Sequence, residues 1–234
     1  MKKGVIFDMD GVLIDSMPFH AEAMRIAVKE VINRDINKKT MYLLEGLPGS
    51  NLVKEIFRRE KIDGGFDDKT IQTISKRKTE IFKAIQKSKA ITGAKELIAE
   101  LKACKCLKAV VSGSSKEEIE SILDENIGSS AFDFIISGDD IEEGKGKPDP
   151  APFQTALDRM NLEPSQAIVV ENSPLGVEAA HNARIPFIVT LNNTPLDTQI
   201  DFDFHLRLDK SEQENRIFED TKSAVAYLKD WCCT

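Results

Sequence analysis

The sequence lacks any apolar run close to the roughly 20 residues that a membrane-spanning helix needs. Only four residues separate Met1-Lys2-Lys3 from Asp8, and an apolar segment of that length is too short for a signal peptide. The chain also has no internal repeat and no low-complexity tract. With 41% hydrophobic and 30% charged residues, its 234 residues favour a globular protein of one large or two small domains. We therefore expect a cytoplasmic protein that has no membrane partner.

A broadly basic surface is missing too, because 32 Lys and Arg residues face 39 Asp and Glu residues and the formal net charge is −7. This balance argues against a nucleic-acid partner. The spacings of the four cysteines, Cys104, Cys106, Cys232 and Cys233, suit neither a zinc ribbon nor a zinc finger, and no histidine lies close by. We expect reduced thiols without a structural role. The absence of a G-x-S-x-G turn disfavours a serine hydrolase.

Short apolar runs recur along the chain, and each is followed by a helical pattern. Because they are apolar on both faces, they predict buried strands of a parallel sheet covered by helices on both sides. Ser115 with Glu118 predicts a capping box, and Asp149 with Pro150 predicts an N-cap and a first-turn proline. The fold class is therefore α/β, with a Rossmann-like doubly wound parallel sheet. The five runs are residues 5–7, 109–111, 134–136, 167–170 and 187–189.

Residues 17 to about 88 show a different pattern. Their apolar residues recur at helical spacing, and no strand-like run appears among them. We expect an all-helical insert at 16–88, with an α/β core built from residues 1–15 and 89–234. The end of the chain is less regular: it suggests a weak strand near His205-Leu206 and a closing helix around 222–229.

Polar residues follow the predicted strands at the points where they end. The carboxyl ends of parallel strands meet at one edge of a sheet, where ligands bind. We therefore expect these side chains to form one site although they are far apart in the sequence. They are Asp8 and Asp10 after the first run, Ser112 and Gly113 after the second, Lys147 beyond the third, and Glu171 and Asn172 after the fourth.

The residue types at this edge suit phosphoryl transfer. Asp8 is placed to attack phosphorus, and Asp10 to protonate the leaving oxygen and later to activate water. Mg²⁺ would offset the repulsion between the two carboxylates. Ser112 and Gly113, which precede a helix, suit a bound phosphate, and Lys147 adds positive charge where the transition state gathers negative charge.

Each feature also has an ordinary explanation when taken alone. The Asp8-x-Asp10-Gly11 turn occurs in calcium loops, but the following residues lack the acidic ligands of an EF-hand. A serine-glycine turn usually only caps a helix, and an isolated lysine such as Lys147 is usually a solvated surface charge. Four such features at one predicted edge favour a site.

These motifs, in this order, resemble the four motifs of the haloacid dehalogenase superfamily. The resemblance covers nearly the whole chain, and the helical insert resembles the small cap of the β-phosphoglucomutase-like and phosphatase branches. It implies that Asp8 is the nucleophile, Asp10 the general acid and base, and Ser112 and Lys147 the phosphoryl-binding pair. It also implies a Mg²⁺ ion held by Asp8, the backbone carbonyl of Asp10 and the pair Glu171-Asn172.

The chain departs from the family pattern at two positions. The family usually has an aspartate where Asn172 stands, so the metal site should carry less negative charge. Ser16, His20 and Lys78 are similar to β-phosphoglucomutase positions on the substrate side of the cap. Gly49, however, stands where the mutase has an arginine that grips a second phosphate.

The resemblance implies a Mg²⁺-dependent phosphatase that hydrolyses a small phosphorylated metabolite, such as a sugar phosphate or a phosphoglycolate-like compound, through an aspartyl-phosphate. The alternative is a β-phosphoglucomutase-like sugar-phosphate mutase, which the glycine at position 49 disfavours. A dehalogenase would not need an acid at Asp10, and a catalytically silent binding module would not need to keep every motif. Family grounds suggest a monomer. The sequence does not identify the metabolite.

Overall fold

The computed structural model describes residues 2–64, 66–197, 201–202 and 214–234. Its centre is a six-stranded sheet in the order β3-β2-β1-β4-β5-β6, and every neighbouring pair of strands is parallel. All five apolar runs form strands, which confirms the predicted α/β class. The strands are β1 Gly4–Asp8, β2 Leu107–Val111, β3 Phe134–Ile136, β4 Ala167–Glu171, β5 Phe187–Leu191 and β6 Glu214–Phe218.

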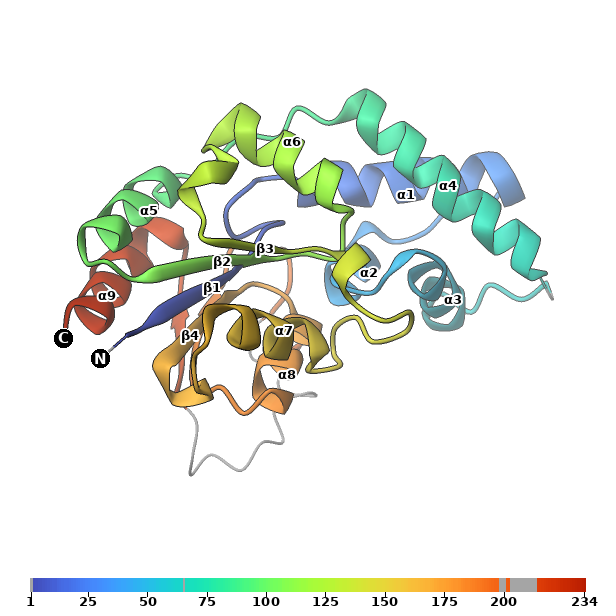
Figure 1. Ribbon diagram of the computed structural model, residues 1–234. Coiled ribbons are helices and arrows are strands. Elements are labelled where there is room, and N and C mark those ends of the chain that lie inside the picture. Colours follow the sequence, from blue (N-terminus) through green and yellow to red (C-terminus); the bar gives the residue numbers. More distant parts are fainter. Residues whose placement is uncertain (1, 65, 198–200, 203–213) are drawn as a thin grey trace.

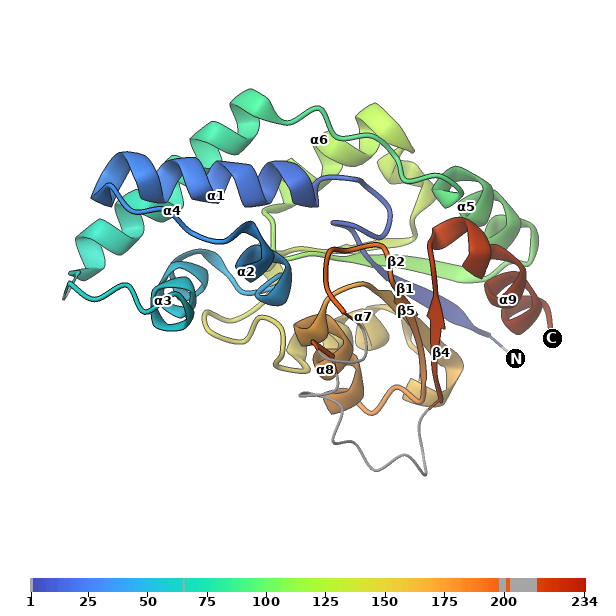
Figure 2. The same ribbon diagram turned by 180° about the vertical axis from the view of Figure 1, so that it is seen from behind.

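Helices cover both faces of the sheet, and a group of four helices, α1 to α4, lies beyond the carboxyl ends of the strands (Figure 1). Helices α5, α6 and α9 lie on one face, and α7 and α8 lie on the other. Figure 2 shows α1 to α4 together at the far side from the two chain ends. The helices are α1 Met17–Ile32, α2 Lys38–Leu43, α3 Gly49–Arg59, α4 Asp68–Ile85, α5 Ala94–Ala103, α6 Lys116–Asn126, α7 Ala151–Met160, α8 Pro174–Asn182 and α9 Thr221–Cys233.

The first strand shows why its residues are apolar without alternation. Val5 and Phe7 belong to the hydrophobic cluster under α5, α6 and α9, whereas Ile6 belongs to the cluster under α7 and α8. All three side chains are fully buried. Successive side chains of a strand point to opposite faces, so a sheet covered on both sides needs apolar residues at every position.

The helical segment between β1 and α5 is held together by α1 and α4, which pack along each other. Pro18 occupies the first turn of α1, and Asn33 ends that helix in the left-handed conformation. The side chain of Asp67 caps α4 by accepting a hydrogen bond from the N–H of Thr70. The segment is all-helical; that it forms a domain of its own stays a prediction.

Four local predictions had mixed outcomes. Ser115 caps α6 by accepting from the N–H of Glu118, but the carboxylate of Glu118 accepts from the hydroxyl of Ser114, so the reciprocal half of the capping box is absent. Asp149 does accept from the N–H of Ala151 at the start of α7. The closing helix is confirmed as α9, and the strand expected near 205–206 lies outside the described residues.

Strand β6 was not predicted. Its sequence, Glu-Asn-Arg-Ile-Phe, has four exposed positions out of five and shows no apolar run. It lies at the edge of the sheet, paired only with β5. An edge strand that faces solvent carries polar side chains and therefore lacks the signal by which the buried strands are found.

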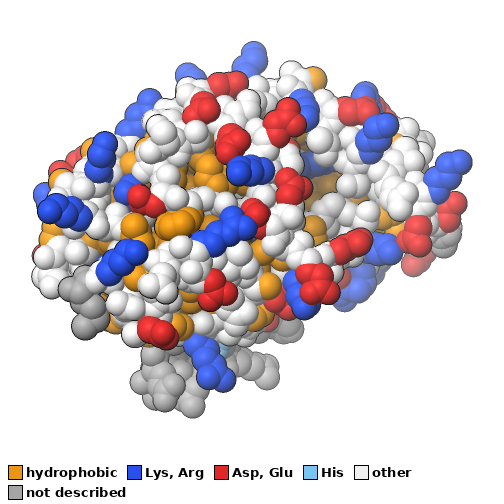
Figure 3. All heavy atoms as spheres, in the orientation of Figure 1, with side chains coloured by type: hydrophobic (Ala, Val, Ile, Leu, Met, Phe, Trp, Pro, Cys, Tyr) orange, Lys and Arg blue, Asp and Glu red, His pale blue; other side chains and the backbone are white. Residues whose placement is uncertain are grey.

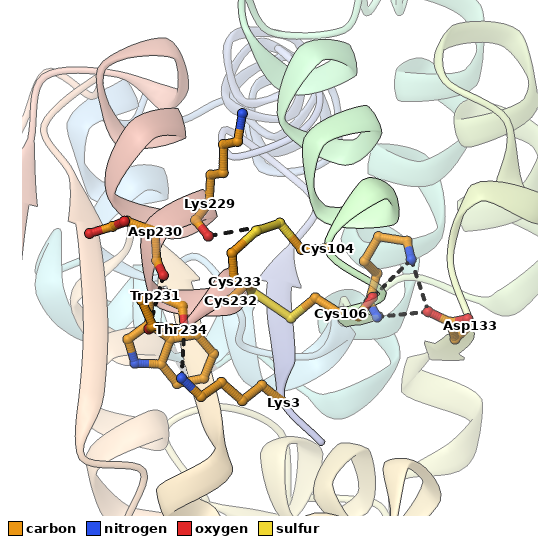
Figure 4. Close-up of a disulfide and its surroundings, with 11 residues drawn as sticks. Lys3, Cys104, Cys106, Asp133, Lys229, Asp230, Trp231, Cys232, Cys233 and Thr234 are labelled. Atoms are coloured by element: carbon orange, nitrogen blue, oxygen red, sulfur yellow. Dashed lines mark hydrogen bonds and ion pairs between the residues drawn. A yellow bond between two sulfur atoms is a disulfide. The ribbon is translucent and has the colours of Figure 1, made fainter. Parts of the chain in front are cut away.

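The expectation of reduced thiols is wrong for this structure. Cys104 pairs with Cys233 and Cys106 pairs with Cys232 in two disulfides, and no cysteine is left free (Figure 4). The pairs form because α9 packs against α5 and so comes to lie beside the turn that leads into β2. Separations of 129 and 126 residues along the chain hid this proximity from the sequence.

Two observations concern the helices and the charged side chains of the described part of the chain. No described helix combines the length and the apolar character that crossing a bilayer requires. On the face shown in Figure 3, basic and acidic side chains are interspersed, and no broad basic patch is visible among the described residues. This mixture agrees with the negative net charge of the chain.

Candidate active site

The ends of three strands and one loop place the polar residues at a common edge of the sheet. Asp8 is the last residue of β1, Ser112 directly follows β2, and Glu171 is the last residue of β4. Lys147 lies in the loop between β3 and α7, in a turn that precedes Pro148. Lys147 contacts both Asp8 and Glu171, whereas Ser112 donates a hydrogen bond to Asp10, whose charge acts on Asp8.

Lys147 joins two of these carboxylates. Its Nζ lies 2.5 Å from an oxygen of Asp8 and 2.5 Å from an oxygen of Glu171, and all three side chains are buried. Burial lowers the pKa of Lys147, but the charges of both carboxylates outweigh it and hold that pKa above its ordinary value. The lysine therefore keeps a positive charge deep in the protein. The other oxygen of Glu171 accepts from the backbone N–H groups of Asn172 and Ser173.

Asp8 is the least satisfied carboxylate of the strand ends. Burial raises its pKa well above the ordinary value, Lys147 lowers it, and the nearby charges of Glu171 and Asp10 raise it again. One of its oxygens is paired with Lys147, and the other, Oδ2, is buried without a hydrogen-bond partner in the described part of the chain. An unpaired carboxylate oxygen at a strand end is suited to a ligand or to reaction.

Asp10 has the opposite environment. Its carboxylate accepts from the hydroxyl of Ser16, accepts from the Ser112 hydroxyl at 3.3 Å, and has one oxygen 3.3 Å from Nε2 of His20. Burial raises the pKa of Asp10, but the effects of His20 and Ser16 are larger in sum and lower it. The structure thus holds Asp10 in its ionised form in a fixed orientation.

His20 connects Asp10 to helix α4. Its ring stacks on Phe82 with the centroids 3.8 Å apart, and Nδ1 lies 2.7 Å from Nζ of Lys78. Burial and the charge of Lys78 lower the pKa of His20, and burial also lowers the pKa of Lys78. An ammonium only donates, so Nδ1 accepts and the ring proton belongs on Nε2, which faces Asp10.

The residues that would bind a metal supply oxygen atoms of the right kind. Oδ2 of Asp8 and the amide oxygen of Asn172 are buried without partners, and such oxygens are the ligands that Mg²⁺ prefers. The amide of Asn172 packs on the backbone of Gly11, where a Cβ atom would lie 1.9 Å from Nδ2. No group of three or more histidine, cysteine or acidic side chains that could hold a metal ion occurs among the described residues.

A cavity of about 320 Å³ opens in front of Asp8 and Asp10, between the sheet edge and the helical segment. Lys147 does not line it but borders a second cavity that shares Gly46, Ser112 and Gly113 with the first. From the strand ends and the loops after them come Asp8, Asp10, Ser112, Gly113 and Ser114, and from the helical segment come His20, Glu45, Gly49, Ser75, Lys78 and Thr79.

Gly49 lines the cavity at the start of α3. Its φ of +26° lies in the region that favours glycine, and a Cβ atom there would meet only Oγ of Ser75, at 3.4 Å. The position offers no side chain of its own to a ligand.

Glu45 is a site residue that the sequence did not reveal. It lies in the turn between α2 and α3, is 8% exposed, and lines the cavity. Burial raises its pKa well above the ordinary value, and the charges of Asp8, Glu171 and Asp10 raise it further, while Lys147 partly opposes them. A glutamate before a glycine is typical of any surface turn, so no local signal distinguished this one.

Comparison with known proteins identifies the family of the chain. The family model of haloacid dehalogenase-like hydrolases matches residues 5–190. A phosphorylated carbohydrates phosphatase of Thermotoga maritima is 28% identical over 183 residues, covering 78% of this chain and 82% of that protein. A phosphoglycolate phosphatase of Rhodospirillum rubrum is 27% identical over 196 residues, covering 81% and 79%. The crystal structure of beta-phosphoglucomutase from Clostridium difficile has a TM-score of 0.77 at 20% identity, covers 99% of this chain and 97% of that one, and shares the fold.

Proposed function

Because the chain belongs to the haloacid dehalogenase-like hydrolases, we propose that this phosphomonoester hydrolase acts on a small phosphorylated metabolite through an aspartyl-phosphate on Asp8. The observation that carries the proposal is the pairing at the sheet edge. Asp8 has one oxygen held by Lys147 and one without a partner, and Asp10, oriented by Ser16 and His20, stands beside it at the same cavity.

The reaction would proceed in two displacements at phosphorus. An oxygen of Asp8 attacks and the ester P–O bond breaks. Asp10, which must first take up a proton from solvent because the free enzyme holds it ionised, gives that proton to the leaving oxygen. Asp10 then takes a proton from water, the water oxygen attacks phosphorus, and the bond to Asp8 breaks. The lowered pKa of Asp10 favours its ionised form, which is the form that the second displacement needs. The free enzyme therefore already has Asp10 in the protonation state that hydrolysis of the aspartyl-phosphate needs, whereas formation of the aspartyl-phosphate needs the protonated form.

The remaining residues bind and orient the phosphoryl group. Ser112 and Gly113 border the cavity at the start of α6, and Lys147 supplies a buried positive charge beside Asp8. Mg²⁺ bound by Asp8, the backbone carbonyl of Asp10 and Asn172 would supply charge neutralisation for the incoming phosphoryl oxygens. Glu171 would support that site through Lys147, because its own oxygens are already occupied.

The helical segment would act as a cap over this site. We take residues 16–88 as the cap and residues 1–15 and 89–234 as the core. His20, Gly49 and Lys78 are then the substrate-side positions of the cap. We also propose a monomer. A cytoplasmic location stays a prediction, and the two disulfides weigh against it because disulfides persist mainly in oxidising compartments.

Hydrolase and mutase differ in what happens to the phospho-aspartate. A mutase must retain a bisphosphate intermediate, and an arginine would grip its distal phosphate by two charge-assisted hydrogen bonds. Gly49 provides no such grip, so we expect water to reach the phospho-aspartate and release inorganic phosphate.

The test is to incubate the enzyme with β-glucose 1-phosphate, Mg²⁺ and a trace of the bisphosphate, and to follow glucose 6-phosphate and free phosphate together. Parallel assays use 4-nitrophenyl phosphate with and without a chelator. Release of phosphate that depends on Mg²⁺ supports the hydrolase. Efficient formation of glucose 6-phosphate with negligible free phosphate would instead establish the mutase, and no turnover of any phosphate ester would overturn both.

A further inference from the structure

The turn that carries Glu45 packs closely against the core, and this packing fixes the position of Glu45. Gly46, at φ +95°, lies so close to the stem of Lys147 that a Cβ atom would be 2.8 Å from Cδ of the lysine. The carbonyl oxygen of Gly46 also approaches Gly113 and Gly146. Only glycine allows this contact between the helical segment and the phosphoryl-binding loops. Glu45 therefore faces the cavity from a fixed position.

The carboxylate of Glu45 has no hydrogen-bond partner among the described residues. Both oxygens are buried, and neither has a hydrogen bond within the described residues. Asp10 and Glu171, in contrast, each accept hydrogen bonds from groups of the protein at the same site. A buried carboxylate without partners costs stability, so the fold retains a group whose partner must come from elsewhere. The cavity that it lines is where a partner can enter.

The missing partner must donate hydrogen bonds and must not be an anion. A carboxylate accepts at both oxygens. Lys78 and Lys83 also line the cavity, but the charges that act most strongly on Glu45 are those of the acidic groups at 8, 10 and 171, which make its immediate surroundings unfavourable for further negative charge. Ser75, Thr79 and Ser114 add hydroxyl groups to the same lining. A chain of hydroxyls on the leaving group would satisfy all of these, whereas a carboxylate or second phosphate would be repelled.

Building on the proposed function, we propose that Glu45 is a specificity residue that accepts hydrogen bonds from leaving-group hydroxyls. The substrate class is then the monophosphates of sugars and polyols. The same carboxylate excludes carboxylated phosphates such as phosphoglycolate, and it disfavours bisphosphates.

The experiment compares wild type with Glu45→Gln and Glu45→Ala on three kinds of phosphate ester. Sorbitol 6-phosphate and β-glucose 1-phosphate carry hydroxyls, 2-phosphoglycolate carries a carboxylate, and 4-nitrophenyl phosphate carries neither. The matched control is Glu80→Ala, which removes a cap glutamate that pairs with Arg77 on the surface. Melting temperatures are measured for every variant without ligand.

We expect Glu45→Ala to lower kcat/KM for the preferred hydroxylated phosphate by about 10–100-fold, as the loss of hydrogen bonds to a charged group would. Turnover of 4-nitrophenyl phosphate should change less than about threefold, and kcat/KM for 2-phosphoglycolate should rise. Glu45→Gln removes the charge but keeps one acceptor, so its loss should be intermediate. Both variants should melt about 2–4 °C higher than wild type, because an unsatisfied carboxylate has been removed.

Several results would overturn the inference while leaving the phosphatase intact. One is an equal loss on all three kinds of ester, which would mark Glu45 as structural or generally catalytic. Another is a wild-type enzyme that prefers 2-phosphoglycolate to the hydroxylated phosphates, or that hydrolyses none of the hydroxylated phosphates. Lower melting temperatures in both variants would show that the protein itself satisfies Glu45.

Discussion

Asp10 and Glu45 are buried carboxylates that line the same cavity, yet their pKa values are shifted in opposite directions. Asp10 belongs to the sheet edge, where Ser16 and His20 compensate for its burial. Glu45 belongs to the helical segment, where no described residue donates a hydrogen bond to it and only the charge of Lys147 partly opposes its burial. The sheet edge is thus prepared for chemistry before a ligand arrives, whereas the helical segment leaves hydrogen bonds for the ligand to complete.

The largest effect on phosphatase activity should come from a substitution at the carboxyl end of β1. Asp8→Asn should reduce phosphatase turnover below detection, because an amide cannot form an acyl phosphate. The measurement is steady-state release of phosphate from 4-nitrophenyl phosphate, with circular dichroism to show that the variant is folded. Wild-type turnover in Asp8→Asn would exclude the covalent mechanism.

Asp10→Asn should lose about 10²–10⁴-fold in turnover, the usual contribution of positioned proton transfer. The phospho-aspartate should still form from 4-nitrophenyl phosphate, whose leaving group needs little protonation, and should then persist. Rapid-quench trapping of labelled enzyme would detect it. If the variant shows neither a slow turnover nor a trapped intermediate, Asp10 does more than transfer protons.

Removing both disulfides should lower the free energy of unfolding by about 2–5 kcal/mol, the usual cost of losing such a link. The two links close nearly the same loop, so breaking only Cys104–Cys233 should cost much less than replacing all four cysteines with serine. Denaturant titrations of the two variants give the difference. Because the links lie at the opposite end of the strands from the cavity, kcat should stay unchanged; a large fall in kcat would contradict this separation.

Asn172→Asp should lower the Mg²⁺ concentration that gives the half-maximal rate by at least about tenfold, the lower end of what even the supporting partners of metal ligands contribute. The physical reason is the added negative charge next to the free oxygen of Asp8. Titration of Mg²⁺ against melting temperature gives a readout that is independent of activity. The exposed Asn161→Asp is the control. A wild-type rate that a chelator leaves unchanged would refute the metal requirement.

The smallest effect should be a pH dependence of stability at Glu45. Because folding raises the pKa of this carboxyl, wild type loses stability as the pH rises through the ordinary range of glutamate and above. Glu45→Gln cannot ionise, so its advantage in melting temperature should be small near pH 4 and larger at pH 7. Asp10 has a lowered pKa, so Asp10→Asn should behave in reverse and lose stability most at pH 7. Identical pH profiles for the two variants would contradict the comparison.

Much of the sheet edge followed from the sequence alone. The buried strands are apolar at every position because helices cover both faces, and a parallel sheet necessarily brings the ends of its strands together. Asp8, Ser112 and Glu171 could therefore be placed side by side without coordinates. The roles proposed for them come from the family resemblance and await the experiments above.

Tertiary structure alone decided the rest. Strand β6 is polar because it lies at an edge, so periodicity could not reveal it. The disulfides depend on α9 packing against α5, more than 120 residues away along the chain. Glu45 has the local sequence of an ordinary turn and becomes a buried cavity residue only because Gly46 packs on Lys147. Local patterns report how a residue relates to its neighbours in sequence, whereas burial and unpaired charge depend on neighbours that only the fold supplies.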